Sequence, residues 1–496
     1  MKVMLINPPF KNEYGKFSRE QRSPAITKGG TFYYPMWLCY SAGVLEKAGI
    51  DVLLMDAPAS GISERTMTER AKQFRPDMIV VDTSTPSIFN DAALAGDLKD
   101  LTGAFTVLVG THPSALPEAT LKIDPRVDAI AIGEYELTVL EIANLLRANP
   151  KPSLEELSTI GGIAFSCDGE THLNNTRELN ADLDELPFVS EVYAKHLHYQ
   201  DYFYAHSKHP IVVTITARGC PHHCIYCVYP QTFSGHKVRY RSIPNVVDEI
   251  EYILAHFPDV KEIMFEDDTL TINKKRCIEF ANEILRRGLH FEWSANSRAD
   301  VDLETMQTLK KAGARLFCVG IESGVQTVLD NMKKNLKVDR IRQFFKDAKK
   351  AGILIHGCFL VGNPGETKET LDVTLQLAKE LNPDTAQFFP IMVYPGTEAY
   401  RWAVQNGYLT TVNYKEWVTE SGLHNTIVSR PGLSAEELVT FCDRARKEFY
   451  LRPKYILTKG LQGMRDPHEL KRLLKGAATL SKHILKPTDR CDACGK

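Results

Sequence analysis

The chain has 496 residues, a formal net charge of −2 and a hydrophobic content of 43%. This length suits two or three domains with sizeable cores, and the composition is that of a folded chain. The near-neutral charge excludes a whole-chain attraction to nucleic acid, and no apolar run approaches the ~20 residues of a membrane span. The first residues enter a strand at once, unlike a secretion signal. Because eleven cysteines in such a chain fit a reducing compartment, we expect a cytoplasmic protein.

Residues 1–150 alternate short β-rich runs with amphipathic helical patterns. The predicted strands cover residues 3–6, 52–55, 78–81, 105–109 and 129–132. This alternation predicts an α/β, Rossmann-like domain with a parallel sheet and helices on both faces. Ligands of such sheets bind beyond the carboxyl ends of the strands. The candidate cofactor-binding residues at those ends are Asn7, Thr83, Ser84, Gly110, His112 and Gly133.

Residues 151–205 are proline-rich and irregular, and they form a predicted linker with one hairpin-like piece at 161–171. The β-then-α rhythm returns at Ile211. The predicted strands are 211–217, 262–265, 291–295, 315–319, 354–360 and 385–388. Six such units predict a partial (β/α)6 barrel over residues 206–425, with its chemistry at the carboxyl ends of the strands.

Three cysteines follow the first barrel strand: Cys220, Cys224 and Cys227, in the spacing Cys-x3-Cys-x2-Cys. Thiolates so placed on a tight loop can hold three irons of a 4Fe–4S cube and leave the fourth iron open. A structural zinc site of three Cys and one His is the alternative. Its histidine would be one of His222, His223 and His236. No second cysteine pair lies nearby, which counts against zinc.

Polar residues also follow the later barrel strands, in the segments 266–269, 296–298, 320–324 and 362–367. Their order around one barrel mouth predicts a shared small-molecule site. Each segment alone is equally a helix start or a capping turn; Asp268 with Thr269 and Gly365 with Glu366 are the clearest examples.

The cysteine motif, with Tyr226 directly before the third cysteine, is similar to the motif that defines the radical SAM enzymes. This resemblance implies that the open iron binds S-adenosylmethionine and that an electron from the cluster releases a 5′-deoxyadenosyl radical, which abstracts hydrogen from an unactivated carbon. It also implies an external electron donor such as flavodoxin or ferredoxin.

The same resemblance implies roles in S-adenosylmethionine binding for several residues of the barrel mouth. The backbone of Tyr226 would meet the adenine, Arg298 would pair with the methionine carboxylate, and Glu322 would reach the amino group or ribose. The candidate residues of this site are Tyr226, Glu266, Asp267, Asp268, Arg298, Glu322, Ser323 and Gly362, with the segment from Glu266 to Asp268 receiving the methionine amino group.

The first domain resembles the cobalamin-binding domain that precedes the barrel in many radical SAM proteins. The Asp-x-His-x-x-Gly signature of methionine-synthase-like domains is absent, and His112 stands in Gly-x-His-Pro instead. The resemblance therefore implies base-off cobalamin with no protein histidine on cobalt. The alternative is a Rossmann-like domain that has lost its cofactor. For His112 itself, the structural reading is a turn histidine bonded to backbone.

The run from Tyr229 to Ser242, with residues 56–59 and 83–87, resembles the branch that holds the anaerobic magnesium-protoporphyrin ester cyclase, and most of all the hopanoid-pathway radical SAM proteins. This implies methylation, rearrangement or cyclisation of a small-molecule, lipid or hopanoid-type substrate. A barrel leaves the substrate open, so this rests on the resemblance. One alternative is a non-catalytic cobalamin- or metal-binding regulatory protein. Another is a zinc-binding RNA-modification protein, although the barrel lacks a basic groove with interleaved aromatic residues.

Residues 426–496 form a predicted helical C-terminal region. Residues 452–490 hold ten Lys or Arg against three Asp or Glu, with leucines at helical spacing. A basic amphipathic helix can lie on an anionic membrane, which would place the protein peripherally at the inner face of the membrane. The alternative is a solvated face on a helix packed against the barrel. Cys491 and Cys494 form either one metal knuckle or two idle thiols in a tail.

Overall fold

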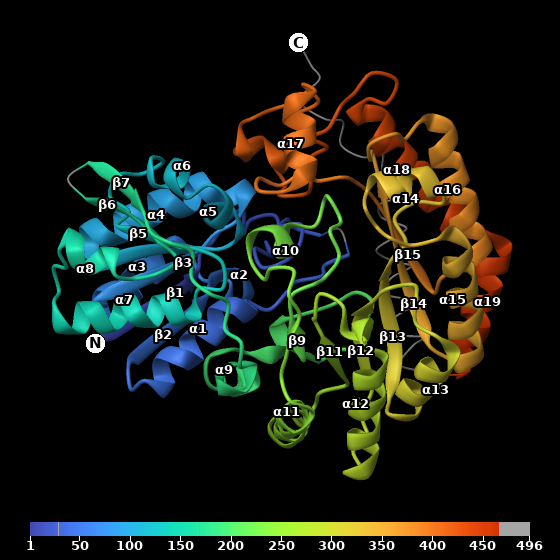
Figure 1. Ribbon diagram of the computed structural model, residues 1–496, viewed down its shortest axis with the longest axis horizontal. Helices are drawn as coiled ribbons and strands as arrows, with labels where there is room; N and C mark the ends of the chain where they lie inside the picture. The colour runs from blue at the N-terminus through green and yellow to red at the C-terminus, as the bar shows by residue number, and fades with distance from the viewer. Residues whose placement is uncertain (28, 168, 466–496) are drawn as a thin grey trace.

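The computed structural model describes residues 1–465 except 28 and 168, and it shows two α/β units side by side (Figure 1). The N-terminal unit is blue to teal, and the barrel unit is green to orange. The predicted knuckle of Cys491 and Cys494, and the basic stretch beyond residue 465, lie outside the described residues.

The first sheet has seven strands in the order β2-β1-β3-β4-β5-β6-β7. Its parallel strands are β1 (Lys2–Asn7), β2 (Asp51–Asp56), β3 (Met78–Asp82), β4 (Phe105–Val109) and β5 (Ala129–Ala131). The hairpin of β6 (Ile163–Cys167) and β7 (Glu170–Leu173) continues the sheet in antiparallel pairing. The hairpin that the sequence placed in the linker therefore extends the first sheet beyond residue 150.

Helices cover both faces of this sheet, as predicted. They are α1 (Met36–Lys47) and α7 (Glu136–Ala148) on one face, and α3 (Glu64–Phe74) and α4 (Ile88–Thr102) on the other. Alternate residues of β1 supply the two cores: Val3 and Leu5 join the core of α1 and α7, while Met4 and Ile6 join that of α3 and α4. A central parallel strand is buried on both faces, so it reads as a continuous apolar run.

The second sheet has six parallel strands, which lie in sequence order from one edge to the other. They are β8 (Ile211–Thr214), β11 (Glu262–Phe265), β12 (Trp293–Ser297), β13 (Ala314–Gly320), β14 (Leu354–Val361) and β15 (Thr385–Pro390). The helices of this unit are α11 (Ile243–His256), α12 (Lys274–Arg286), α13 (Leu303–Lys311), α14 (Gln326–Asn331), α15 (Val338–Ala351), α16 (Lys368–Leu381) and α18 (Ala435–Tyr450). This arrangement confirms the predicted partial (β/α)6 barrel.

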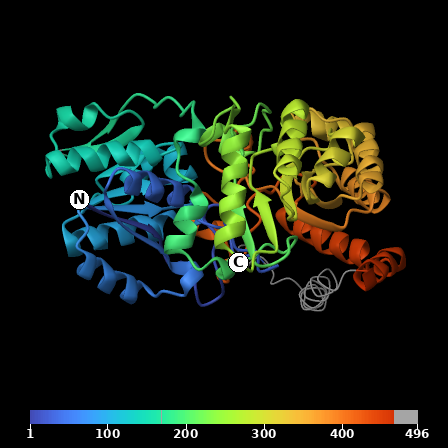
Figure 2. The ribbon, with the colours of Figure 1, turned by 90° about the horizontal axis from the view of Figure 1, so that it is seen from below.

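Short elements complete the fold. They are α2 (Ala57–Ser60), α5 (Thr111–Ala115), α6 (Pro117–Leu121), α8 (Leu154–Ser158), α9 (Val189–His196), β9 (Ala217–Arg218), α10 (Val228–Thr232), β10 (Arg239–Tyr240), α17 (Glu398–Gln405) and α19 (Pro453–Arg465). In both views α19, in red, lies on the side of the barrel away from the N-terminal unit (Figure 2). None of the described helices combines the length and apolar character that crossing a membrane requires.

Two long connections bring the units together: the β1–α1 loop (residues 8–35) and the segment between β15 and α18 (residues 391–434). They contact each other, since the amide of Ile26 donates to the carbonyl of Gly422 at 2.8 Å and the hydroxyls of Ser23 and Tyr394 are 3.1 Å apart. Side chains of both connections therefore reach the space between the two sheets.

Candidate active site

The cysteine loop begins directly after β9 and is fixed by a glycine and an amide. Gly219 has φ +89, and a Cβ there would lie 2.4 Å from the carbonyl oxygen of Lys237, so only glycine fits. The side-chain amide of Gln231 donates to the carbonyls of Cys224 at 3.2 Å and Cys227 at 2.9 Å. These contacts hold the backbone between the second and third cysteines in one conformation.

All three cysteines of the motif are free thiols; Cys224 is buried, while Cys220 and Cys227 are half-buried. Burial raises the pKa of the Cys220 and Cys227 thiols. The donor set fits a cube, which takes one thiolate at each of three irons. In the described part of the chain, no three His, Cys, Asp or Glu side chains lie close enough to hold a single metal ion. Nδ1 of His236 lies 3.1 Å from the carbonyl oxygen of Cys220, and its ring lies tilted against that of His223 with centroids 4.0 Å apart.

The three acidic residues after β11 have different environments. Asp267 is buried and accepts two hydrogen bonds of 2.6 Å from the amide and hydroxyl of Thr216, and burial raises its pKa to about 6. Glu266 and Asp268 instead face the barrel mouth, where both pair with Arg22 of the β1–α1 loop, at 2.9 and 3.2 Å. Thr269 precedes the 3-10 turn Leu270–Ile272 without a capping hydrogen bond from its side chain, and Asn273 caps α12.

A triad of two buried residues, Glu322 and Lys334, and the half-buried Tyr226 follows β13 and the cysteine loop. The hydroxyl of Tyr226 donates to Glu322 at 2.9 Å, and the ammonium of Lys334 lies 2.9 Å from the same carboxylate and 3.0 Å from that hydroxyl. Glu322 has φ +67, a conformation that costs energy in a non-glycine residue and is typical of functional sites. Burial alone would lower the pKa of Lys334, but Glu322 raises it, so the lysine stays charged.

The other predicted residues of this mouth have structural partners. Arg298 donates to the backbone carbonyls of Lys334 at 2.7 Å and Asn335 at 3.1 Å, so it holds the loop that carries the lysine. Ser323 is buried, with its hydroxyl 3.2 Å from that of Thr374. The binding roles of Arg298 and Ser323 stay predictions.

The turn after β14 is closed by Glu366, whose carboxylate accepts from the amides of Gly362 at 2.5 Å and Asn363 at 2.8 Å. Burial raises the pKa of Glu366 to about 7. Glu366 therefore has the role of the capping turn that the sequence analysis gave as the alternative for Gly365 and Glu366. Gly362 has φ +95, and a Cβ there would lie 2.9 Å from Leu438 of α18. Its role toward S-adenosylmethionine stays a prediction.

The candidate cobalamin residues follow parallel strands of the first sheet and so meet at its carboxyl edge. Asn7 donates to Asp56 at 3.0 Å, and the hydroxyl of Thr83 donates to the carbonyl of Val109 at 2.7 Å. Gly110 has φ +119, and a Cβ there would lie 2.4 Å from the carbonyl oxygen of Thr83. The turns of this edge therefore pack closely. Two further candidate residues lie at this edge of the sheet. The hydroxyl of Ser84 is 2.8 Å from that of Ser87, and Gly133 has φ +71.

His112 is buried at this edge, and burial lowers its pKa to about 3, so its ring is neutral. Its Nδ1 lies 3.1 Å from the hydroxyl of Thr85, and the ring meets the Tyr414 ring edge-on at 4.8 Å. The sequence reading of a turn histidine bonded to backbone was wrong about the partner, because the turn brings a threonine side chain within reach.

We predict that His112→Ala leaves the absorbance spectrum of bound cobalamin unchanged, because we expect base-off cobalamin with no protein histidine on cobalt. The measurement is the visible spectrum of cobalamin-loaded protein, compared with that of His172→Ala, which changes a histidine of β7. A spectral shift that signals loss of an axial nitrogen in the His112 variant alone would contradict the prediction.

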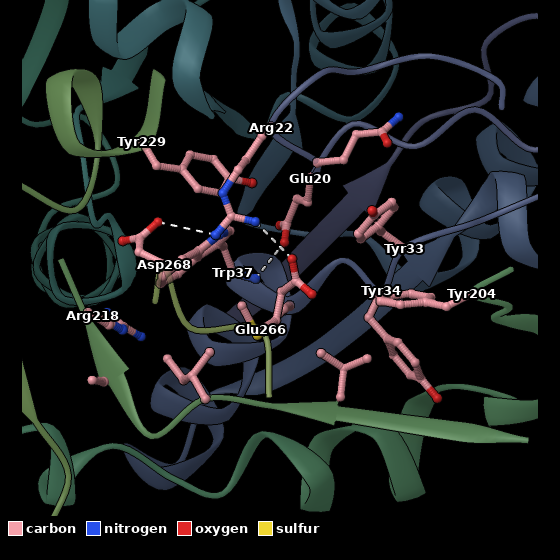
Figure 3. Close-up of a pocket in the computed structure, with 15 residues that line it drawn as sticks. Glu20, Arg22, Tyr33, Tyr34, Trp37, Tyr204, Arg218, Tyr229, Glu266 and Asp268 are labelled. Carbon is pink, nitrogen blue, oxygen red and sulfur yellow. Dashed lines mark hydrogen bonds and ion pairs between the residues drawn. The ribbon is translucent and has the colours of Figure 1, made fainter. Parts of the chain in front are cut away.

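A pocket lies between the two units, lined by aromatic and charged side chains of both (Figure 3). Tyr33, Tyr34 and Trp37 come from the β1–α1 loop and the start of α1, and Tyr229 comes from α10. The other labelled residues of the pocket are Glu20, Arg22, Tyr204, Arg218, Glu266 and Asp268. The pocket therefore adjoins the barrel mouth on one side and the N-terminal domain on the other.

Next to this pocket, buried ion pairs that include Arg218 join the two units. Arg218, two residues before Cys220, lies 3.1 Å from Glu134 and also pairs with Glu136. Arg239 of β10 donates to Glu134 at 2.8 and 2.5 Å. All four side chains are at most 4% exposed. The cysteine loop is thus tied to the turn after β5.

Residues that the sequence analysis missed include Arg22, Arg218 and Lys334. Each is a charged residue whose partner lies 12 to 246 positions away in the chain. No spacing pattern marks such residues. The three cysteines and the glycines at strand ends, in contrast, were predicted, because the spacing within one loop is visible in the sequence.

Comparison with known proteins identifies both units. The Radical SAM superfamily matches residues 214–378, and the B12 binding domain matches residues 22–143. An uncharacterized methyltransferase of Pyrococcus horikoshii is 30% identical over 92% of this chain and 94% of its own length. The chain therefore belongs to the radical SAM superfamily and carries a B12-binding domain. It is an enzyme whose cofactors are a 4Fe–4S cluster, S-adenosylmethionine and cobalamin, which confirms the predicted set over zinc, an empty domain or a non-catalytic regulator.

The predicted likenesses within the superfamily are also found. The anaerobic magnesium-protoporphyrin IX monomethyl ester cyclase of Rubrivivax gelatinosus is 28% identical over 74% of this chain and 66% of its own, and the hopanoid C-3 methylase of Methylococcus capsulatus is 23% identical over 77% and 70%. A solved structure of the methyltransferase TsrM from Kitasatospora setae matches with a TM-score of 0.65 and 18% identity, covering 82% of this chain and 75% of that one. At this identity the structural match shows the fold alone.

Proposed function

We propose that the protein is a methyltransferase that acts on an unactivated carbon of a small-molecule or lipid substrate. The observation that carries this proposal is the pocket of Figure 3, which lies between the barrel mouth and the cobalamin-binding domain. The free space of the pocket is about 20 Å³, so a substrate would enter by displacing side chains that line it. A substrate there would be in reach of both cofactor sites, which methyl transfer requires. The name of the relative from Pyrococcus horikoshii supports the same reaction class.

When bound, the cluster and S-adenosylmethionine supply a radical that abstracts hydrogen, and cobalamin supplies a methyl group. The protein's own residues bind and orient. Cys220, Cys224 and Cys227 hold the cluster, while Glu266 and Glu322 are anionic groups suited to the methionine amino group and the ribose. The aromatic rings of the pocket exclude water from the substrate, and apolar surfaces of this kind suit ligand pockets. An external reductant, such as flavodoxin or ferredoxin, would supply the electron.

The reaction class is tested with the anaerobically reconstituted enzyme, S-adenosylmethionine with a deuterated methyl group, and a lipid extract. We expect S-adenosylhomocysteine and 5′-deoxyadenosine together, and a lipid that gains the labelled methyl group. Formation of 5′-deoxyadenosine without S-adenosylhomocysteine would favour rearrangement or cyclisation and overturn the proposal.

A lipid substrate is supported by the outer face of α19, where apolar side chains are unusually exposed. Ile456, Leu457 and Leu461 are 49 to 67% exposed. Tyr455 and Lys459 form the opposite face and are buried against the barrel, where Tyr455 donates to the carbonyl of Asp384 at 2.8 Å. An exposed apolar stripe of this kind marks an interaction surface, and the exposed Lys454 lies on the same helix.

We predict that the purified protein co-sediments with anionic but not neutral vesicles and is released by salt. Each basic residue near an anionic surface contributes ~1 kcal/mol, which salt screens. The paired change Leu457→Ser and Leu461→Ser should weaken sedimentation, and so should replacing Lys471, Arg472 and Lys475 by Gln. The control is Val412→Ser, which changes a valine that is 77% exposed elsewhere. Equal binding to neutral vesicles, or none to either, would contradict the prediction.

A further inference from the structure

Four consecutive residues of the β1–α1 loop, Arg19 to Arg22, run from one candidate cofactor site to the other. Arg19 is buried at the carboxyl edge of the first sheet. Its guanidinium donates to the side chain of Asn7 at 2.7 Å and to the carbonyl of Pro8 at 2.6 Å. The remaining nitrogens form a two-point pair with Asp91, at 3.0 and 2.7 Å. Arg19 therefore fixes the position of a predicted cobalamin residue.

Arg22, three residues later, reaches the barrel mouth. Its guanidinium lies 2.9 Å from Glu266 and 3.2 Å from Asp268, and it covers the Tyr229 ring at 5.4 Å (Figure 3). Burial disfavours the charge, but the two carboxylates raise the pKa of Arg22, so it stays positive. Arg22 thus bridges the N-terminal domain to the carboxylates proposed for the methionine amino group.

The residues between these two arginines are also fixed. Glu20 accepts from the amides of Trp37 at 2.6 Å and Leu38 at 2.9 Å, and so closes the first turn of α1. The side-chain amide of Gln21 donates to the carbonyl of Ala25 at 3.0 Å. Four residues span at most about 14 Å when extended, and every one of them is held by hydrogen bonds. A displacement of Arg19 is therefore expected to move Arg22, and a displacement of Arg22 to move Arg19.

The mouth retains one position for a further donor. Oε1 of Glu266 accepts from Arg22 and, at 3.3 Å, from Asn296. Its Oε2 is buried and has no hydrogen-bond partner among the described residues. Arg22 offsets one of the two negative charges of Glu266 and Asp268. The single remaining charge and the unpaired oxygen match one ammonium group, which supplies three N–H donors.

We propose that the segment Arg19–Arg22 couples the two cofactor sites, so that the affinity for S-adenosylmethionine depends on whether cobalamin is bound. Arg22 acts as a positioning residue: it holds Glu266 so that the free oxygen meets the methionine ammonium. Coupling of this kind is reciprocal, so S-adenosylmethionine changes the affinity for cobalamin by the same factor. The inference rests on the proposed role of Glu266 in the methyltransferase.

The test is the dissociation constant of S-adenosylmethionine for the cluster-reconstituted full chain, measured by equilibrium dialysis with and without hydroxocobalamin. In the unchanged protein we expect cobalamin to change this constant by about 5- to 150-fold, the usual range of such coupling. Arg22→Gln should bind both cofactors but with constants that no longer depend on each other. Arg22→Lys keeps the charge without the two-point geometry and should retain only part of the effect.

The matched control is Arg65→Gln, which removes a surface arginine of the same domain that pairs with Glu69. It should behave as the unchanged protein does. Full coupling in Arg22→Gln, or no coupling in the unchanged protein, overturns the inference. Failure of the unchanged protein to bind either cofactor overturns the proposed function too, and it is seen before any variant is measured. Circular dichroism and iron content confirm that Arg22→Gln folds.

Discussion

The Cys224→Ala variant forms no 5′-deoxyadenosine, yet it folds. Two thiolates remain, which are too few to hold a cube with one open iron. The cysteine is buried, at 8% exposed, but alanine leaves only a small gap, and the clamping amide of Gln231 contacts the backbone and not the thiol. We expect the iron content after anaerobic reconstitution to fall to background and the circular dichroism spectrum to stay unchanged.

The matched control is Cys442→Ala, which removes a buried thiol of α18 outside the cysteine motif. It should keep both iron and S-adenosylmethionine cleavage. If Cys224→Ala still releases 5′-deoxyadenosine at a rate comparable with the control, the cluster assignment is wrong. If both variants lose iron, the loss reflects general instability and the specific role of Cys224 is contradicted.

Glu134→Ala lowers the urea midpoint of unfolding more than other single changes at the domain interface. Glu134 pairs with Arg218 and Arg239, and all three side chains are buried. Removing the carboxylate leaves two guanidinium groups without their shared partner in an interior that water cannot reach. Breaking a buried ion pair in this way costs about 3–5 kcal/mol. Because Arg218 lies two residues before Cys220, cluster incorporation should fall as well.

Glu141→Ala serves as the control, since Glu141 is 47% exposed and pairs with Arg177 at the surface of the same helix region. Exposed pairs contribute little to stability. A urea midpoint for Glu134→Ala that matches the control would show that the buried charges do not hold the domains together. The urea dependence of tryptophan fluorescence reports the transition, with Trp37 beside Arg218 at the interface.

Local pattern was enough to predict both sheets and the cysteine loop. Apolar runs such as Met78–Val81 are set by burial on two faces of a parallel strand, and this is a property of neighbours in the chain. The hairpin at 161–171 was also recognised, but its place at the edge of the first sheet was not. A strand pattern carries no information about which edge of which sheet the strand will pair with.

For the mouth of the barrel, the sequence predicted which segments line it but not which side chains pair with one another. The run from Glu266 to Asp268 identified the strand end, yet the structure turns Asp267 toward Thr216 and leaves its neighbours facing Arg22. Which carboxylate points where depends on residues 51 and 244 positions away. The same holds for Lys334, which reaches Glu322 because the backbone of its loop is held by Arg298. Such pairings arise from tertiary packing, which a single sequence does not record.

The buried charges at the interface also bear on how such enzymes can be recombined. A chimera that joins this barrel to the N-terminal domain of a relative would inherit Arg218 and Arg239 but not necessarily an acceptor in the turn after β5. The cysteine loop would then lose its anchor although its own sequence is intact. A change at Glu134 or at Arg218 alone leaves a buried charge with one partner fewer. We therefore expect that a functional exchange must carry the turn at 133–136 along with the barrel.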